Sequence, residues 1–196
     1  MPKKELPEPY YSLVELPFNP CDICRPKEPL KKLISACKPK IIVELGSWLG
    51  VSTCLMAALL PETGKVYAVD HWFGPKGWEN RSDFAHVLPT LYQGFLSNVK
   101  HLGFCHKIVP VRMTTVEASK ALNVVPDLIY VDTDHEEEDV TRDIFAWHPK
   151  LAPGGVMCGD DFNIPGVRKA VLNTAMELGQ LVCFDDVLWW FSGSSH

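Results

Sequence analysis

Apolar residues along this chain fall into short uninterrupted runs and into stretches with helical spacing. The runs predict strands at 41–45, 65–70, 107–111, 127–132 and 154–159. The spaced positions predict helices at 28–37, 51–60, 114–122, 136–147 and 165–179. Because strands and helices alternate, the pattern predicts an α/β fold with a doubly wound, mostly parallel sheet.

Both ends of the chain depart from this alternation. Two apolar runs near the C-terminus, 181–184 and 187–191, flank Asp185 and Asp186, which predicts an antiparallel hairpin closing the sheet. Residues 1–29 are proline-rich and lack periodicity, so we expect an irregular arm before a single domain at 30–196. Segment 71–104, rich in aromatic residues and glycine, is too long for a plain connection; it predicts either a substrate-covering lid or an ordinary subdomain core or dimer contact.

A glycine turn follows the first predicted strand. The turn carries Glu44, Gly46, Trp48 and Gly50, and the second predicted strand ends in Asp70. In open α/β sheets such a crevice binds a nucleoside-bearing ligand, and the acid accepts hydrogen bonds from ribose hydroxyls. A dinucleotide-binding loop needs a middle glycine where this chain has Trp48, so the turn does not match that class. A phosphate-binding loop needs a lysine after its last glycine, and no lysine follows Gly50.

The pattern Glu44-x-Gly46-x-x-x-Gly50 with Asp70 resembles the first two motifs of class I S-adenosylmethionine-dependent methyltransferases, whose Rossmann-like sheet ends in an antiparallel hairpin. The resemblance implies a cofactor site that includes Glu44, Gly46, Ser47, Trp48, Gly50, Ser52, Thr53, Asp70, His71, Trp72, Thr114 and Asp132. Two alternatives stay open within it. The hydroxyls of Ser47, Ser52 and Thr53 either bind the cofactor carboxylate or cap the following helix. Trp72 either packs over the adenine or belongs to the core or a lid.

Carboxylates follow the next two strands of the predicted sheet. Asp132 and Asp134 come after one strand, and Asp160 and Asp161 come after the other. The ends of neighbouring parallel strands lie close together, so these acids would repel one another unless protonated or bridged by a cation. An all-oxygen anionic set suits Mg²⁺, Mn²⁺ or Ca²⁺, whereas the competing interpretation is that Asp161 caps the next helix.

A narrower resemblance rests on three stretches, 128–140, 149–162 and 165–171. They are similar to the methyltransferase-24 group, which resembles the metal-dependent sugar O-methyltransferases of the macrocin type and, more distantly, catechol O-methyltransferase. The resemblance implies that Asp132, Asp160 and Asp161 are metal ligands and that Asp134 is the general base. His135 departs from the sugar enzymes' pattern; it either shares the base role or is structural.

Composition limits the classes of partner. A net charge of −5 over 196 residues argues against nucleic-acid binding, and no apolar run is long enough to span a membrane. Seven cysteines, an odd number that includes Cys21 and Cys24, predict reduced thiols and a cytoplasmic protein, and the oligomeric state, including a homo-oligomer, stays open.

Together these patterns predict a methyltransferase. The expected reaction is divalent-metal-assisted methyl transfer from S-adenosylmethionine to a hydroxyl of a small molecule, a sugar or a diol. The alternatives are a methyltransferase-fold protein that binds the cofactor without turnover, a metal-independent methyltransferase and, less favoured, a nicotinamide-dependent oxidoreductase.

Overall fold

A seven-stranded sheet forms the centre of the molecule. The computed structural model describes residues 5–19, 27–74 and 85–193. The strand order is β3-β2-β1-β4-β5-β7-β6, and β1 to β5 run parallel while β7 lies antiparallel to both β5 and β6. The strands are β1 (Ile41–Leu45), β2 (Lys65–Asp70), β3 (Ile108–Arg112), β4 (Leu128–Val131), β5 (Val156–Gly159), β6 (Gln180–Asp185) and β7 (Leu188–Gly193).

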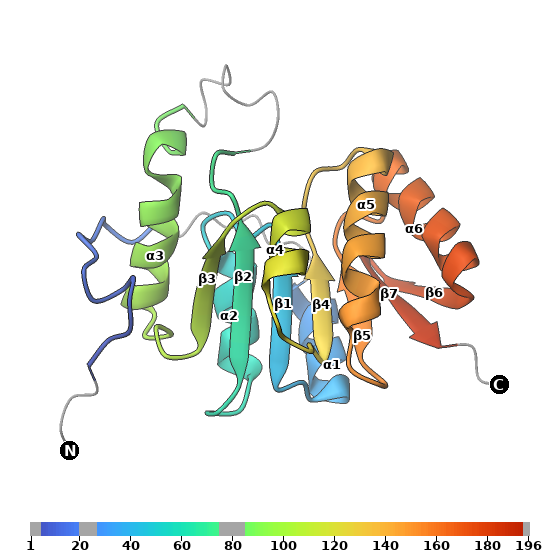
Figure 1. Cartoon of the computed structure of the whole chain (residues 1–196), viewed down its shortest axis with the longest axis horizontal. Helices are drawn as coiled ribbons and strands as arrows, with labels where there is room; N and C mark the ends of the chain where they lie inside the picture. Colours follow the sequence, from blue (N-terminus) through green and yellow to red (C-terminus); the bar gives the residue numbers. More distant parts are fainter. Residues whose placement is uncertain (1–4, 20–26, 75–84, 194–196) are drawn as a thin grey trace.

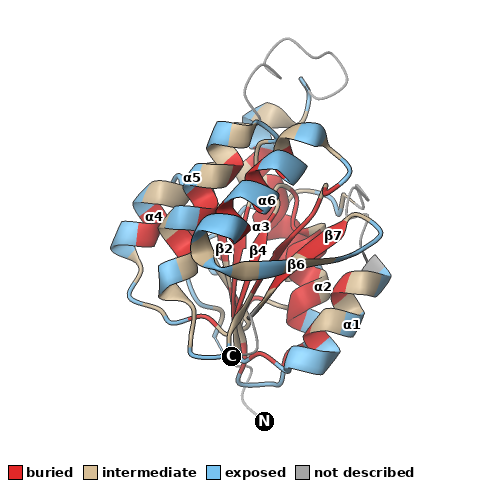
Figure 2. Cartoon of the chain, turned by 90° about the vertical axis from the view of Figure 1, so that its right-hand side faces the viewer, coloured by how far each residue is buried: buried red, intermediate tan, exposed pale blue. Residues whose placement is uncertain are grey.

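Helices cover both faces of this sheet (Figure 1). One buried cluster joins the sheet to α1 (Lys27–Cys37), α2 (Val51–Leu59) and α3 (Leu91–His101). A second cluster joins the other face to α4 (Thr115–Ala121), α5 (Glu137–Trp147) and α6 (Pro165–Leu178). Figure 2 shows the consequence, with buried residues along the sheet and exposed residues on the outer sides of the helices. No helix in the described part of the chain is long and apolar enough to cross a membrane.

The fold class predicted from the sequence is confirmed. Every predicted strand and the C-terminal hairpin are present, with bounds that differ from the prediction by at most two residues. The parallel sheet forms because the β1, β4 and β5 runs are apolar on both faces, as strands covered by helices must be.

Helix α3 lies inside the segment expected to be a lid. Its Leu91, Phe95 and Val99 are fully buried against the α2 face of the sheet, so this part of 71–104 forms core, which was the alternative expectation. The lid interpretation now concerns residues 75–84, which lie outside the described residues, as do Cys21 and Cys24.

Residues 5–19 of the N-terminal arm lie along α3 and form no regular helix or strand. Asn98 on α3 is buried; its side chain accepts from the backbone N–H of Asn19 (2.9 Å) and donates to the carbonyl of Leu49 (2.9 Å). The hydroxyl of Tyr10 donates to the Ile108 carbonyl on β3 (3.1 Å). The described part of the predicted arm is therefore fastened to the domain by buried polar contacts.

Candidate active site

The carboxyl ends of the parallel strands meet at one edge of the sheet. Backbone bonds continue the ladder one residue past the strands, from the Gly46 N–H to the Val69 carbonyl (2.9 Å), from Asp132 to Leu45 (2.8 Å) and from Asp160 to Val131 (3.0 Å). The loops after β1, β4 and β5 therefore start at the same level, as expected for a ligand crevice in an open α/β sheet.

The glycine turn after β1 packs directly against the end of β4. Gly46 has φ +86°, and a Cβ added to it would lie 1.9 Å from the backbone oxygen of Asp132. Gly50 has φ +85°, and its Cβ would meet the Phe95 ring at 3.0 Å. Trp48, between them, also has a positive φ, +46°. Both glycines are thus required by the close approach of the protein's own atoms, and any side chain would open the turn.

Asp70 fastens this turn to the end of β2. Its Oδ2 accepts from the backbone N–H groups of Ser47 (3.1 Å) and Trp48 (2.9 Å), and its Oδ1 accepts from the N–H of Trp72 (2.6 Å). Burial raises the pKa of the Asp70 carboxyl, and these backbone donors oppose the rise. A carboxylate has about four acceptor positions, so three amide donors leave capacity for a further hydroxyl.

Glu44 is fully buried beneath the turn. It accepts hydrogen bonds from the hydroxyls of Ser47 (2.7 Å), Ser52 (2.5 Å) and Thr53. Burial raises the pKa of Glu44 to about 7, and the three hydroxyl donors moderate the rise. These hydroxyls were expected to bind the cofactor or to cap the helix. In the structure they donate to Glu44, and Gly50 begins α2 without a side-chain cap. Cofactor binding by these residues stays a prediction.

Trp72 lies in the core, which was one of the two expectations for it. The ring is 2 % exposed, lies 4.7 Å and 4.8 Å (centroid to centroid) from Tyr92 and Phe95, and donates from Nε1 to the Trp48 carbonyl (2.8 Å). The sequence places an aromatic residue after β2 but does not show whether its side chain points into the core or toward a ligand. In the structure the backbone of Trp72 has a positive φ (+55°), and its ring lies in the core.

An exposed aromatic surface beside Asp70 was not foreseen. His71 stacks on Phe73 at 5.5 Å, and Phe73 is 73 % exposed. The guanidinium of Arg112 lies 4.8 Å from the Tyr92 ring centroid and 5.7 Å from that of Phe73. Asp70 ends β2 and Arg112 ends β3, and the parallel register pairs these two residues at the same edge of the sheet. The charged residues that end these two strands are therefore the part of this surface that the sequence could indicate.

Thr114 caps a helix. It accepts from the Glu117 N–H (3.3 Å), and the Glu117 carboxylate accepts from the Thr114 N–H (3.1 Å), a complete capping box at the start of α4. The Thr114 hydroxyl is therefore used in the helix cap. Cofactor binding by Thr114 stays a prediction.

The predicted convergence of carboxylates occurs. Burial raises the pKa of Asp132 well above its ordinary value, and the charges of Asp160 and Asp161 raise it further. Asp160 is 5 % exposed, and its Oδ1 accepts from the backbone N–H of Asp161 (2.7 Å). Asp132, Asp134, Asp160 and Asp161 all line one small pocket at this edge.

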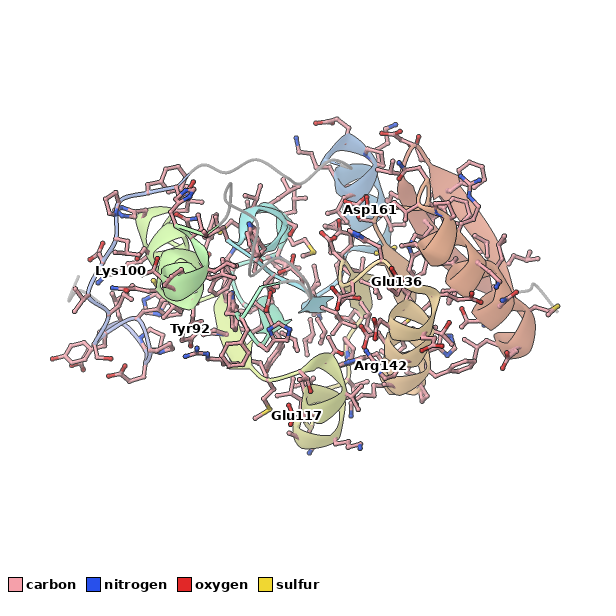
Figure 3. All side chains as sticks on the ribbon, turned by 90° about the horizontal axis from the view of Figure 1, so that it is seen from above. Tyr92, Lys100, Glu117, Glu136, Arg142 and Asp161 are labelled. Atoms are coloured by element: carbon pink, nitrogen blue, oxygen red, sulfur yellow. The ribbon has the colours of Figure 1, made fainter. Side chains whose placement is uncertain are left out.

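His135 and Asp161 are joined by a hydrogen bond within this pocket. His135 Nε2 lies 2.8 Å from Asp161 Oδ2, across the loops that follow β4 and β5. Figure 3 looks down on this edge, with Asp161 and Glu136 labelled on the two loops. The hydrogen bond to Asp161 raises the pKa of His135, burial opposes it, and the negative charges of Asp161, Asp134 and Asp160 add to the rise. Asp161 has a positive φ, +59°, and α6 begins after Ile164 without a side-chain cap, so the expected capping role of Asp161 is not found.

The predicted cation site is not formed by these side chains. Among the described residues no group of three or more His, Cys, Asp or Glu is arranged to hold a metal ion. The physical reason is that two of the three carboxylates already have partners within the protein. Asp161 is turned toward His135, and Asp160 accepts from a backbone N–H. Asp132, Asp160 and Asp161 therefore converge but do not fit a ready three-carboxylate site.

Glu44 predicts a pH dependence of stability. An unfolded glutamate titrates near 4.5 and the folded one near 7, so the native state holds this proton more tightly. The Glu44 contribution is therefore fully present below pH 4.5 and is lost as pH rises to 7. It amounts to about 3 kcal/mol over that interval. Glu44→Gln, which keeps the shape and one acceptor, should remove this decline.

The measurement is urea unfolding of both proteins at several pH values between 4.5 and 7.5. Glu117→Gln serves as control because Glu117 is exposed on the surface. If the wild type and Glu44→Gln kept the same difference in unfolding free energy at every pH, the buried titration would be wrong.

Comparisons with known proteins identify the family and the fold. A profile of the family described as "Methyltransferase domain", the methyltransferase-24 family, matches residues 43–162. No curated protein sequence matches the chain.

Solved structures with the same fold are numerous. The cofactor-bound protein Rv0187 from MTB superposes with a TM-score of 0.67 at 15 % identity, covering 95 % of this chain and 83 % of its own. The O-methyltransferase TomG from Streptomyces achromogenes, in complex with S-adenosylmethionine, gives 0.63 at 15 % identity (86 % and 79 %). An O-methyltransferase from Bacillus cereus, in complex with S-adenosylhomocysteine, gives 0.60 at 15 % identity (84 % and 79 %).

At these identities the structural likeness establishes the fold, and the profile match, over more than half of the chain, establishes the family. The glycine turn, the acid after β2 and the closing hairpin agree with both. The chain belongs to the methyltransferase-24 family of class I S-adenosylmethionine-dependent methyltransferases.

Proposed function

We propose that this protein transfers the methyl group of S-adenosylmethionine to a hydroxyl oxygen of a small molecule, with His135 as general base and Asp161 as its positioning carboxylate. The observation that carries the proposal is the 2.8 Å contact between His135 Nε2 and Asp161 Oδ2, at the sheet edge that also carries the glycine turn. A base within hydrogen-bond distance of a carboxylate that orients it is a recurrent arrangement for proton removal.

The residues around the turn fit the cofactor. The side-chain-free backbone at Gly46 brings the turn into contact with the end of β4, so that the glycine turn and the carboxylates lie side by side at the edge where the cofactor would bind. Asp70 retains acceptor capacity for a ribose hydroxyl, and the acids near the strand ends favour a cationic group. When bound, S-adenosylmethionine supplies a methyl group already activated on a sulfonium.

What remains for the protein is to orient an oxygen and remove its proton. His135 Nε2 donates to Asp161, which leaves Nδ1 to accept the proton. The carboxylate then stabilises the imidazolium that forms. The His135 side chain is 48 % exposed, so the acceptor can approach it from the open side of the pocket.

A hydroxylated small molecule suits this site better than a nucleic acid. The chain has a net charge of −5, and the pocket beside His135 is lined by four aspartates, which would repel a phosphate backbone. A sugar or a diol is the acceptor that the resemblance favours, and a cofactor-binding protein without turnover is the rival.

The first prediction for the proposed function separates the methyl-transfer step from cofactor binding. His135→Gln should lower kcat about 100-fold or more, because general-base catalysis contributes that much. Asp161→Asn should also lower kcat, since it leaves the imidazole without its anionic partner. Asp134→Asn is the matched control in the same pocket and should change kcat only a few-fold.

The readout is methyl transfer over a panel of hydroxylated acceptors, together with calorimetry of S-adenosylmethionine, whose Kd should stay within a few-fold in all three variants. A large loss in Asp134→Asn with full activity in His135→Gln would reassign the base to Asp134.

The second prediction concerns the cofactor. Asp70→Asn exchanges one acceptor oxygen for a donor, and should weaken S-adenosylmethionine binding at least tenfold, because hydrogen bonds to a charged group contribute about 1.5–3 kcal/mol each. Asp127→Asn is the control. Asp127 also binds two backbone N–H groups, those of Lys40 (2.8 Å) and Ile41 (2.9 Å), but at the opposite end of β1.

Calorimetric titration of both variants tests this assignment. Equal losses of affinity in both would mean that loosening the sheet, rather than losing a ligand contact, weakens binding. Unchanged affinity in Asp70→Asn would remove Asp70 from the cofactor site.

The third prediction concerns assistance by a divalent metal ion. The family resemblance favours such an ion, whereas the arrangement of the aspartate side chains does not fit a three-carboxylate site. Because Asp161 is paired with His135, we expect methyl transfer to persist after exhaustive chelation, within about twofold of the untreated rate. A loss of activity that Mg²⁺ or Mn²⁺ restores would return a cation held by Asp132, Asp160 and Asp161 to the mechanism.

A further inference from the structure

Asn98 on α3 connects the N-terminal arm to the glycine turn. Its side chain is 3 % exposed, and its amide bonds to backbone atoms of both segments. Nδ2 donates to the Leu49 carbonyl in the turn (2.9 Å) and to the Asn19 carbonyl in the arm (3.0 Å). Oδ1 accepts from the Asn19 N–H (2.9 Å). One buried amide therefore joins two segments that are distant along the chain.

The arm determines the orientation of this amide. Both backbone groups of Asn19 bond to it, the N–H to Oδ1 and the carbonyl to Nδ2. Rotating the Asn98 amide by 180° would set donor against donor and acceptor against acceptor, so the docked arm accepts one orientation only. That orientation directs the second N–H of Nδ2 at the Leu49 carbonyl.

The turn that receives this bond has a backbone that needs support. Trp48 and Gly50, on either side of Leu49, have positive φ values of +46° and +85°. A tryptophan in this region is strained, and such a conformation persists only where surrounding contacts hold it. Asp70 holds the turn from β2 through the Trp48 N–H (2.9 Å), and Asn98 holds it from α3 through the Leu49 carbonyl.

Helix α3 also packs against the turn without free space. A Cβ added to Gly94 would lie 3.0 Å from Leu49 Cδ2, and a Cβ added to Gly50 would lie 3.0 Å from the Phe95 ring. Because closely packed groups transmit small displacements, a shift of this part of α3 would move the turn.

The stretch 14–19 of the arm is held on α3 mainly by polar contacts. The Gln93 side chain donates to the Val14 carbonyl (2.6 Å), and Ser97 Oγ accepts from the Leu16 N–H (2.9 Å). Figure 1 shows the arm beside α3. Val14 is 76 % exposed and Phe18 is 44 % exposed, so these side chains bury little apolar surface. A segment held in this way detaches at a lower free energy than the core.

We propose that Asn98 is a positioning residue for the glycine turn, and that docking of arm residues 14–19 and binding of S-adenosylmethionine strengthen each other through it. The inference rests on the proposed function, because it takes this turn as part of the cofactor site. Linkage requires the two effects to be equal: the factor by which the docked arm tightens cofactor binding is the factor by which the cofactor tightens arm docking.

Two variants of the full chain test the connection from its two ends, with S-adenosylhomocysteine as the probe in calorimetry. Asn98→Leu removes all three hydrogen bonds at similar volume and should raise the Kd about five- to tenfold. Asn19→Pro removes the arm N–H that Asn98 accepts and leaves the packing of α3 intact, so folding is not at risk. It should raise the Kd about three- to fivefold.

Each variant has a matched control. Ser97→Ala alters the neighbouring buried position of α3; it removes the bond to Leu16 but keeps the Asn98 bonds. Val14→Pro places a proline in the arm at a residue that bonds to α3 through its carbonyl. Both controls should bind S-adenosylhomocysteine within about twofold of the wild-type Kd.

Amide hydrogen exchange followed by NMR supplies a readout that a loss of overall stability would not produce. Without cofactor, the Ser47 and Trp48 N–H groups should exchange faster in Asn98→Leu and Asn19→Pro than in the wild type. Addition of S-adenosylhomocysteine should slow exchange at Leu16 in the wild-type arm, and this effect should be absent in Asn98→Leu.

Wild-type values of both Kd and exchange in Asn98→Leu and Asn19→Pro would overturn the inference. Equal losses of affinity in Ser97→Ala and Asn98→Leu would also overturn it, since the stability of α3 would then explain them. If the wild type bound no S-adenosylhomocysteine, the proposed function would fall. Faster exchange at Trp48 in Asn19→Pro would in that case still support the connection between the arm and the turn.

Discussion

The close contact between the Gly46 turn and the end of β4 is the constraint on which the site depends. A Cβ at Gly46 would lie 1.9 Å from the Asp132 backbone oxygen, so the two loops touch through backbone atoms alone. This contact sets the distance between the part of the edge proposed to bind the cofactor and the part that carries the carboxylates. Asp70 then holds the outer side of the turn, and Glu44 holds its inner side.

The same closeness explains the electrostatics of the edge. Burial raises the pKa values of Glu44, Asp70 and Asp132, because their carboxyls are withdrawn from water in a small volume. Backbone and hydroxyl donors oppose the rise at Glu44 and Asp70, whereas the charges of Asp160 and Asp161 add to it at Asp132. A site of this kind is stabilised by a positively charged ligand, which accords with a sulfonium cofactor and provides no favourable place for a phosphate.

The sequence was informative where the backbone alone decides the outcome. The mostly parallel sheet, the position of the glycine turn and the convergence of four aspartates all follow from alternating elements and from the rule that parallel strands end at one edge. It was less informative where a side chain chooses between partners. Ser52 and Thr53 donate to Glu44, Trp72 turns into the core, and Asp161 pairs with His135. Each choice depends on contacts between loops that are distant along the chain, and these contacts leave no local pattern.

The two loops that carry His135 and Asp161 both pack against the start of α6. Gly166, near the start of α6, approaches the loop after β4 so closely that a Cβ there would lie 2.3 Å from the His135 backbone oxygen. Arg168 follows two residues later, and its Nε bond to the Phe162 carbonyl ties α6 to the loop after β5. The proposed base and its positioning carboxylate are thus held by the first turns of one helix. The glycine turn is attached instead to β1, β2 and the end of β4. The architecture therefore allows the acceptor side to vary without disturbing the cofactor side, which is how one fold can serve different acceptors.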